Sequence, residues 1–114
     1  MKIKVTTGDI TRIKAGAIIV NFFEGTKAPE GDTATADQAL DGAISRLVRQ
    51  KEIKGNLNEI TLIHSLGKLP ADRVIVTGLG KKTELTLDRI RGAMAETCRY
   101  LRPKGVESIA TITQ

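Results

Sequence analysis

Aromatic residues and cysteine are scarce in this 114-residue chain, and their scarcity excludes several kinds of site. Aromatic side chains make up 3% of the residues, and Phe22, Phe23 and Tyr100 are poor material for stacking nucleic-acid bases. The single cysteine, Cys98, excludes an internal disulfide framework and a cysteine-based zinc site. Because Cys98 falls on the apolar face of a predicted helix, we expect its thiol to be packed in the core.

Long hydrophobic runs are also missing. No apolar run approaches the roughly 18 residues needed to span a bilayer. The alternating start Met1-Lys2-Ile3-Lys4-Val5 lacks the apolar block of a signal peptide. These features predict a cytoplasmic protein with no membrane partner. The formal net charge of +5 could help the chain meet an anion, but it is not a nucleic-acid signature alone.

Five short segments have strand character, since each is rich in β-branched residues and bounded by Gly, Pro, Asp or Asn. They span residues 2–7, 17–23, 60–66, 73–79 and 108–113. The second segment is almost continuously apolar, and so is Val74-Ile75-Val76 in the fourth. Such runs are typical of central strands that are covered on both faces.

Two segments have helical periodicity. The first has six residues on one stripe at spacings of three and four: Ala36, Leu40, Ala43, Ile44, Leu47 and Val48. Thr35 followed by Gln38 fits a capping box for this helix. The second stripe contains Leu87, Ile90, Met94, Thr97, Cys98 and Leu101. Thr86 is its expected N-cap, and Pro103 with Gly105 is expected to end it.

The order strand, strand, helix, strand, strand, helix, strand predicts an α/β fold. The first helix is long enough for a right-handed parallel crossover between the second and third strands. Residues 67–72 are too few for a crossover and imply an antiparallel pair. We therefore expect one domain over residues 1–114, with a mixed, mostly parallel sheet of about five to six strands flanked by helices. The longest loop is expected at residues 24–32.

Two groups of residues could carry metal or acid–base chemistry. His64 is the only histidine and shares one face of its predicted strand with Leu62 and Leu66. A catalytic histidine needs a hydrogen-bonding partner or further metal ligands, which the sequence does not indicate, so we expect a structural residue near the edge of the core. Asp37 and Asp41 lie one helical turn apart and could bind a cation together. A solvated helix face, with acids near a helix N-terminus where the dipole favours them, is the preferred interpretation.

Three further segments have features of binding sites. The loop Gly78-Leu79-Gly80-Lys81-Lys82-Thr83 could approach an anion through its backbone, but it lacks the P-loop pattern and predicts a tight turn. Asp9, between the first two strands, could cap its own turn or accept a hydrogen bond from a ligand. Arginines along the second helix could contact phosphates, although a water-facing side is preferred: Arg89, Arg91, Arg99 and Arg102.

Several segments resemble, in the right order, the N-terminal domain of the leucyl aminopeptidase family, the cytosolic exopeptidases with two metals. Residues 17–25 resemble a family strand that leaves into Phe23-Glu24-Gly25, and residues 52–59 resemble the family's F-K-G-K-x-G-E region. The most specific similarity is to the family's V-G-L-G-K, at Val76-Thr77-Gly78-Leu79-Gly80-Lys81. The resemblance covers nearly the whole chain.

This resemblance implies a parent enzyme that removes N-terminal residues from peptides with a water held between two divalent cations, Mn or Zn. The implied ligands are Lys, Asp and Glu of a C-terminal catalytic domain, to which no residue of this chain corresponds. We therefore assign no catalytic or metal-binding residue and no cofactor here, and expect the fragment alone to be inactive. The implied roles are assembly and active-site access in a homo-oligomer, a hexamer in the family, with the parent's catalytic domain as partner.

The same domain is similar in fold to a macro domain. Gly8-Asp9-Ile10-Thr11 and Val20-Asn21 resemble the macro-domain motifs G-D-I-T and V-N-A-A-N, although the rest of the second motif is replaced. The alternative function is therefore a stand-alone module that binds ADP-ribose or a related nucleotide through Asp9 and Asn21. A third hypothesis, a DNA-binding accessory domain, rests on charge alone, so nucleic acid is not an expected partner.

Overall fold

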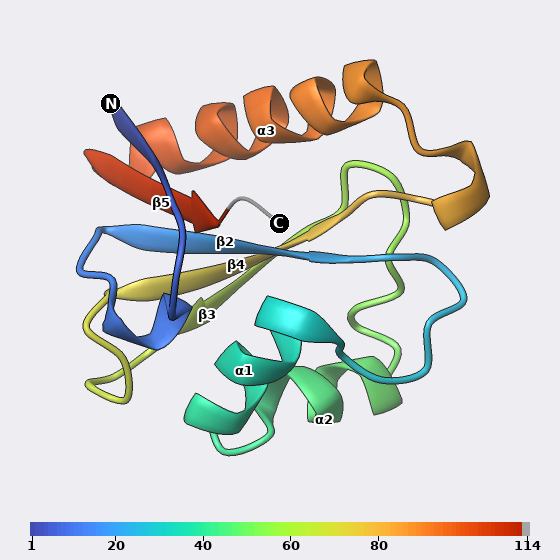
Figure 1. Ribbon diagram of the computed structural model, residues 1–114, viewed down its shortest axis with the longest axis horizontal. Helices are drawn as coiled ribbons and strands as arrows, with labels where there is room; N and C mark the ends of the chain where they lie inside the picture. Colours follow the sequence, from blue (N-terminus) through green and yellow to red (C-terminus); the bar gives the residue numbers. More distant parts are fainter. Residues whose placement is uncertain (113–114) are drawn as a thin grey trace.

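The computed structural model describes residues 1–112, and five strands and three helices make up its regular structure (Figure 1). The strands are β1 (Lys2–Thr6), β2 (Ala17–Phe22), β3 (Ile60–His64), β4 (Arg73–Gly78) and β5 (Ser108–Ile112). The helices are α1 (Gly31–Ala39), α2 (Ala43–Arg49) and α3 (Leu87–Leu101), and short 3₁₀ turns are η1 (Ile10–Arg12), η2 (Lys82–Glu84) and η3 (Arg102–Lys104). The five predicted strands are confirmed, and the first four end one or two residues before their predicted carboxyl ends. Thr113, the end of the fifth prediction, lies outside the described residues.

The sheet has the order β1-β5-β2-β4-β3. The pairs β1–β5, β5–β2 and β2–β4 are parallel, and β3–β4 is antiparallel. The mixed, mostly parallel sheet and the antiparallel third and fourth strands are therefore confirmed. The parallel crossover from the second to the third strand is wrong, because β3 runs opposite to β2. The chain goes first to the outer edge and reverses in the short β3–β4 connection, so that β4 becomes the parallel neighbour of β2.

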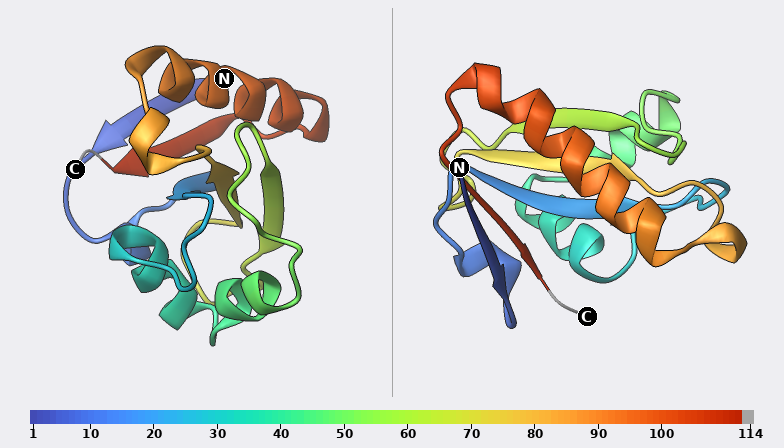
Figure 2. Two further views of the ribbon diagram at one scale, coloured as in Figure 1. Left: turned by 90° about the vertical axis from the view of Figure 1, so that its right-hand side faces the viewer. Right: turned by 90° about the horizontal axis from the view of Figure 1, so that it is seen from above.

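Helices cover both faces of the sheet (Figure 2). On the side of α1 and α2 lies a cluster that includes Ile18, Val20, Ile44, Val74 and Val76. On the side of α3 lies a second cluster that includes Ile19, Ile75, Cys98, Leu101 and Ile109. Successive residues of β2 and β4 enter opposite clusters, which explains why both strands are continuously apolar. The core position expected for Cys98 is confirmed.

The first predicted helix is two helices. α1 ends at Ala39, and the chain turns through Asp41 and Gly42, whose φ angles are 56° and 81°. Positive φ is incompatible with a continuing right-handed helix, so the apolar stripe bends around the core instead of running straight. The capping box is also wrong. The N-cap is Glu30, and the Thr35 hydroxyl donates to the carbonyl of Gly31 one turn back.

The second predicted helix is confirmed as α3. The Thr86 hydroxyl accepts a hydrogen bond from the Arg89 N–H at 3.2 Å, which satisfies one of the unpaired N–H groups of the first turn. Gly105, in the left-handed region at φ 75°, follows η3 and ends the helical segment. Within residues 1–112 no helix is long and apolar enough to cross a membrane.

The preferred interpretation of Asp37 as a solvated residue is wrong. Asp37 is only 8% exposed, and its carboxylate accepts hydrogen bonds from the backbone N–H and the hydroxyl of Ser45 in the first turn of α2. It therefore caps α2 from the preceding helix. Asp41 is exposed and forms an ion pair with Lys68 at 2.7 Å, so the two carboxylates do not form one site.

We expect Asp37→Ala to lower the free energy of unfolding by about 1–2 kcal/mol, because the N–H and the hydroxyl of Ser45 lose their acceptor. Urea denaturation monitored by circular dichroism measures the change. The matched control is Asp41→Asn, which also removes a carboxylate but keeps a residue that tolerates positive φ, and is expected to cost less than about 0.5 kcal/mol. Equal costs for the two variants would contradict the capping role.

Candidate functional site

A crevice opens at the carboxyl ends of the central strands. Within residues 1–112, β5 pairs with β2 over three pairs, from Ala17–Ile109 to Ile19–Thr111, whereas β2 stays paired with β4 as far as Phe22. Where β5 and β2 part, the crevice has a volume of about 620 Å³. In open α/β sheets ligands bind outside the carboxyl ends of the strands, so this crevice is the leading candidate site.

The inner wall of the crevice is largely apolar. Its apolar lining residues are Val5, Ile19, Val20, Phe22, Leu79, Leu85, Ile90, Ala93 and Met94. The buried hydroxyls of Thr77 and Thr97 lie 3.2 Å apart, and Thr97 donates to the carbonyl of Ala93 at 2.8 Å. Because the Thr97 proton is used in that bond, Thr77 is the donor to Thr97. Both protons are therefore used within the fold rather than offered to a ligand.

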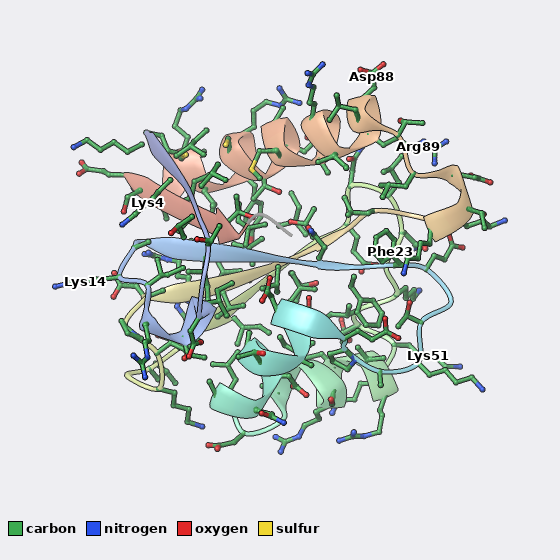
Figure 3. The ribbon with its side chains drawn as sticks, in the orientation of Figure 1. Lys4, Lys14, Phe23, Lys51, Asp88 and Arg89 are labelled. Carbon is green, nitrogen blue, oxygen red and sulfur yellow. The ribbon has the colours of Figure 1, made fainter. Side chains whose placement is uncertain are left out.

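The outer rim of the crevice is polar. Asn21 is exposed at the end of β2, and its backbone carbonyl accepts a hydrogen bond from the Thr33 hydroxyl at 2.6 Å. Phe23 follows, with the Lys82 ammonium 5.6 Å from the centroid of its ring. Figure 3 shows Phe23 at the end of the molecule that also holds Asp88 and Arg89, in the first turn of α3. Glu30 and Asp32, at the start of α1, also line the crevice. Two carboxylates at this helix N-terminus offset its dipole and disfavour a bound anion.

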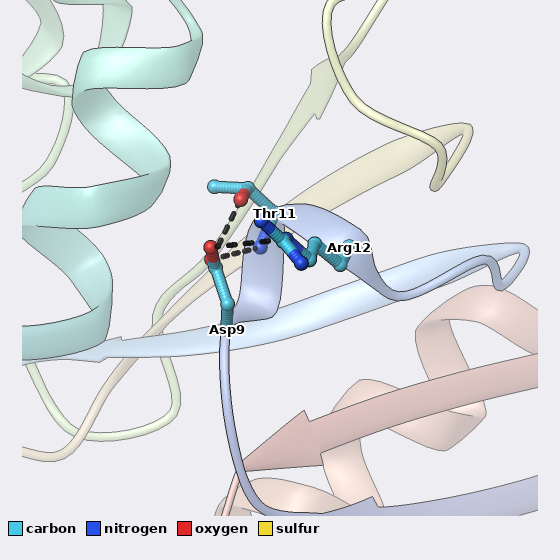
Figure 4. A network of polar contacts seen from close by, with 3 residues as sticks. All are labelled: Asp9, Thr11 and Arg12. Carbon is cyan, nitrogen blue, oxygen red and sulfur yellow. Dashed lines mark hydrogen bonds and ion pairs between the residues drawn. The ribbon is translucent and has the colours of Figure 1, made fainter.

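Asp9 does not line the crevice. Its carboxylate accepts hydrogen bonds from the Thr11 N–H at 2.9 Å and the Thr11 hydroxyl at 2.6 Å (Figure 4). The Arg12 Nε lies 3.8 Å from its other oxygen. Asp9 thus caps its own turn, which was one of the two interpretations of the sequence. The hydroxyl bond from Thr11, followed by the backbone bond from Thr11, lowers the pKa of the Asp9 carboxyl below its ordinary value.

We expect Thr11→Val to raise the pKa of Asp9 toward its ordinary value of 3.8, because the hydroxyl bond to the carboxylate is lost. Since folding lowers this pKa, its stabilisation is present above the ordinary value and is lost as the pH falls through the lowered pKa. The stability difference between the variant and the wild type should therefore shrink in acid. An NMR pH titration measures the pKa, with Asp41, held low by Lys68, as internal control. An unchanged Asp9 pKa in the variant would contradict the assignment.

The predicted tight turn lies after the glycines, in η2 (Lys82–Glu84), and the glycine segment itself is a packing device. Three successive backbone N–H groups donate to protein carbonyls: Gly78 to Glu59 at 2.8 Å, Leu79 to Phe22 at 3.0 Å and Gly80 to Gly55 at 2.8 Å. A Cβ on Gly78 would lie 2.0 Å from the carbonyl oxygen of Asn56. These amides are therefore committed to the residue 55–59 loop and to β2, and they do not form an anion site.

The remaining candidate residues are not assembled into a site. His64 is exposed at the end of β3, and Leu66 is 86% exposed, so the expected position of His64 near the core edge is wrong. The reason is that β3 is an edge strand and ends at His64. Within residues 1–112 no three His, Cys, Asp or Glu side chains gather where they could hold a metal ion, so these residues do not fit the two-metal centre. Arg91, Arg99 and Arg102 are exposed, as expected of a water-facing side, whereas Arg89 is half-buried and pairs with Glu84.

Sequence reasoning missed two groups of residues. Thr77 and Thr97 meet under α3 although 20 residues separate them. The only sequence signal for Thr77 was the alternation of β4, in which successive side chains face opposite sides of the sheet. Glu59 accepts hydrogen bonds from the N–H groups of Lys54 and Gly55 at 2.9 and 3.0 Å and so holds the loop that packs on Gly78. A carboxylate four or five residues after a Lys-Gly turn was the signal for this contact.

Solved structures define the fold class. A macrodomain of Trypanosoma brucei in complex with ADP superposes with a TM-score of 0.74 at 18% identity, over 96% of this chain and 46% of that chain. A mutant of tomato leucine aminopeptidase superposes with a TM-score of 0.73 at 13% identity, over 98% of this chain and 23% of that chain. The domain therefore has the macrodomain-like α/β fold, as the sequence resemblance predicts.

The sequence defines the family. Residues 19–113 match the model of the cytosol aminopeptidase family, N-terminal domain. A probable cytosol aminopeptidase of Geobacter sulfurreducens is 38% identical over 112 residues, which are 98% of this chain but 23% of that relative. The chain belongs to the cytosol aminopeptidase family and corresponds to its N-terminal domain. It spans about a quarter of the length of the curated relatives it matches.

Proposed function

We propose that this chain is the non-catalytic N-terminal domain of a cytoplasmic, two-metal aminopeptidase, and that it serves assembly and active-site access. The observation that carries the proposal is that the relatives match nearly all of this chain with only a small part of their own length. The Geobacter relative and the tomato enzyme each match at least 98% of this chain with only 23% of their own length. The described residues offer no metal-ion cluster. Manganese or zinc binding and the hydrolysis of N-terminal residues therefore belong to the remainder of the parent enzyme, which acts as a homo-oligomer, a hexamer by resemblance.

The first test is the activity of the purified chain of residues 1–114 on leucine p-nitroanilide with manganese or zinc added. We expect no hydrolysis above the buffer blank, because two-metal catalysis needs both cations held against the substrate. Metal-dependent turnover that a chelator abolishes would overturn the non-catalytic assignment.

The second test concerns assembly. In a chimera, this chain replaces the N-terminal domain of the Geobacter sulfurreducens relative; the control is that relative without the domain. We expect the chimera to keep the oligomer size and the leucine-amide hydrolysis of the intact relative, and the control to lose the assembled state. Size-exclusion chromatography with light scattering measures the size. A chimera that assembles no better than the control would contradict the assembly role.

The crevice supports a second candidate function, the binding of ADP-ribose or a related nucleotide with Asn21 at its rim. The position of the crevice at the carboxyl ends of the strands favours it, whereas Glu30 and Asp32 oppose a diphosphate and Asp9 lies outside the lining. Titration calorimetry with ADP-ribose tests whether the crevice binds a nucleotide. Heat that is lost in Asn21→Ala would support the nucleotide function, and no heat at high micromolar ligand would end it.

A further inference from the structure

The two edge strands of the sheet, β1 and β3, differ in how well they are protected against pairing with another chain. An edge strand presents unpaired N–H and carbonyl groups, and native proteins commonly block such an edge with charged side chains or proline. β1 follows this rule, because Lys2 and Lys4 lie on it. β3 has the sequence Ile-Thr-Leu-Ile-His and contains no Lys, Arg, Asp, Glu or Pro. The edge at β3 is therefore open to a further strand (left-hand view of Figure 2).

The backbone groups that face this open edge belong to alternate residues of β3. The Ser65 N–H, just after the strand, donates to the Asp72 carbonyl at 3.1 Å and so continues the ladder with β4. Because the direction of the backbone groups alternates along a strand, positions 61 and 63 also face β4. The three residues between these positions direct their N–H and carbonyl groups away from the sheet: Ile60, Leu62 and His64. No other strand of the described chain lies beside them.

The spacing of these residues fits a second copy of the same strand. When two copies of β3 meet antiparallel with Leu62 opposite its own counterpart, Ile60 of each copy lies opposite His64 of the other. All three are then hydrogen-bonded pairs, in which each residue donates its N–H and accepts with its carbonyl. Between them, Thr61 of one copy lies opposite Ile63 of the other, a pair of β-branched side chains. Charged side chains do not face each other anywhere along the paired strands.

The β1 edge does not offer the same match. The Lys2 N–H donates to the Glu107 carbonyl at 2.7 Å, so the alternate residues Ile3 and Val5 face outward. Pairing Ile3 of one copy with Val5 of another would place Lys4 directly opposite Lys4. Like charges in that position destabilise a strand pair. Self-pairing is therefore favoured at β3 and opposed at β1.

Two exposed leucines flank β3. Leu66, in the turn after the strand, is 86% exposed, and Leu57, before the strand, is 38% exposed. The same antiparallel register, continued past the ends of β3, brings Leu66 of one copy close to Leu57 and Asn58 of the other. A two-fold axis repeats this contact at both ends of the paired strands. Burial of these leucines adds an apolar contribution to the backbone hydrogen bonds.

We propose that two copies of this chain pair antiparallel through β3, with Leu62 at the two-fold axis, and join their five-stranded sheets into one. The outer edges of the joined sheet are then the two β1 strands, whose lysines oppose further growth, so assembly stops at the dimer. The inference rests on the proposed function in that it names a surface for the assembly role. One strand pair with two leucine contacts is smaller than a standard interface, so we expect a dissociation constant of roughly 10 to 100 µM.

Hydrogen exchange of single amides, measured by NMR on the 1–114 protein at about 30 µM and about 1 mM, tests the register. We expect the amides of Ile60, Leu62 and His64 to exchange about three- to fivefold more slowly at the higher concentration, because the fraction of monomer falls by that factor. The amides of Ile3 and Val5, which also face outward but on β1, are the matched control. Their exchange should not depend on protein concentration.

A substitution in β3 tests the same contact by mass. His64→Pro removes an outward N–H that the second copy needs, and proline is tolerated where the N–H of an edge strand faces solvent. The matched control, His64→Ala, keeps the N–H. In sedimentation equilibrium we expect the wild type and His64→Ala to rise from about 12.3 kDa toward twice that mass with concentration, and His64→Pro to stay near 12.3 kDa. Urea denaturation checks that the proline variant is folded.

Leu66→Asn serves as a second variant that leaves the fold intact. The side chain of Leu66 is almost fully in water, and its φ of 52° suits asparagine better than leucine. We expect this variant to raise the dissociation constant of the dimer by about fivefold or more, because the apolar contact at each end of β3 is lost. An unchanged dissociation constant would contradict the proposed register.

Three outcomes would overturn the inference. They are a wild-type protein that stays monomeric at 1 mM, a dimer in which exchange slows at Ile3 and Val5 instead of in β3, and a folded His64→Pro variant that dimerises like the wild type. Peptide hydrolysis is not measured in these experiments. A monomeric, inactive fragment would therefore refute this inference and leave the non-catalytic assignment standing, while an active fragment would refute that assignment alone.

Discussion

Gly78→Ala is expected to unfold the domain or to lower its free energy of unfolding by more than about 4 kcal/mol. The added Cβ would lie 2.0 Å from the Asn56 carbonyl oxygen and 2.9 Å from the Gly55 carbonyl carbon. Both are backbone atoms in a loop tied to β4 by hydrogen bonds, so neither can move without breaking them. Urea denaturation measures the loss, and recovery of the variant in the insoluble fraction is the expected result if no folded state remains.

The matched control for this change is Gly92→Ala. Gly92 is exposed in the middle of α3, and a Cβ there meets nothing within 4 Å. Alanine is favoured over glycine in a helix by about 0.8–1 kcal/mol, so this variant should be more stable than the wild type. A Gly78→Ala protein within about 1 kcal/mol of the wild type would show that the residue 55–59 loop does not lie against β4.

The expected cost of Gly78→Ala would explain why glycines occur in the segment Val76–Lys81, which carries the most specific family resemblance. Its glycines are explained by close backbone approach: Gly78 packs on Asn56, and Gly80 donates to the Gly55 carbonyl at a φ of 76°. A packing requirement therefore accounts for the motif in this domain without a ligand. The loop in turn positions Leu79 and Lys82 on the wall of the crevice.

Ile18→Ala is expected to lower the free energy of unfolding by about 2–5 kcal/mol, the range for truncating a large buried aliphatic side chain. Ile18 is 0% exposed in the central strand β2, between β4 and β5, and packs in the cluster under α1 and α2. The other members of this cluster come from the sheet and from α1 and α2, and they cannot all close on the space left. Chemical denaturation measures the effect, and the m-value is expected to stay unchanged.

The control for this variant is the same substitution on the edge strand, Ile3→Ala. Ile3 is 54% exposed, so its truncation in the 1–114 protein should cost less than about 0.5 kcal/mol. Comparable costs at the two positions would mean that Ile3 is already buried, by a second copy or another segment.

Local sequence patterns predicted most of the elements. The five strands and α3 were recognised because β-branched runs, helical spacing and the Thr86 cap act within a few residues of one another. The family was recognised because the matching segments occur in the same order as in the relatives, and the family match confirms it. A self-capped turn was one of the two interpretations of Asp9. This interpretation was accessible from the sequence because the partners of Asp9, Thr11 and Arg12, lie within three residues of it.

The crevice could be predicted only in part. Asn21 was singled out by resemblance and lies on the rim, but Asp9, chosen in the same way, lies outside the lining. The hydroxyl pair of Thr77 and Thr97 joins a strand and a helix, and no local pattern relates them. Within the described part of the chain, β5 and β2 part after Ile19, and the position of the crevice depends on where these two distant segments stop pairing.

By itself, the sequence determined that this chain is an α/β domain of the aminopeptidase family with strongly apolar central strands, because periodicity and turn residues act locally. The tertiary structure decided the rest. The break between α1 and α2 accompanies the packing of both helices on one face of the sheet, and it brings Asp37 against Ser45. The direction of β3 relative to β2 depends on the strand order, in which β4 lies between them. An amphipathic stripe records which side of a helix is buried, but not where the chain must bend to keep that side against the core.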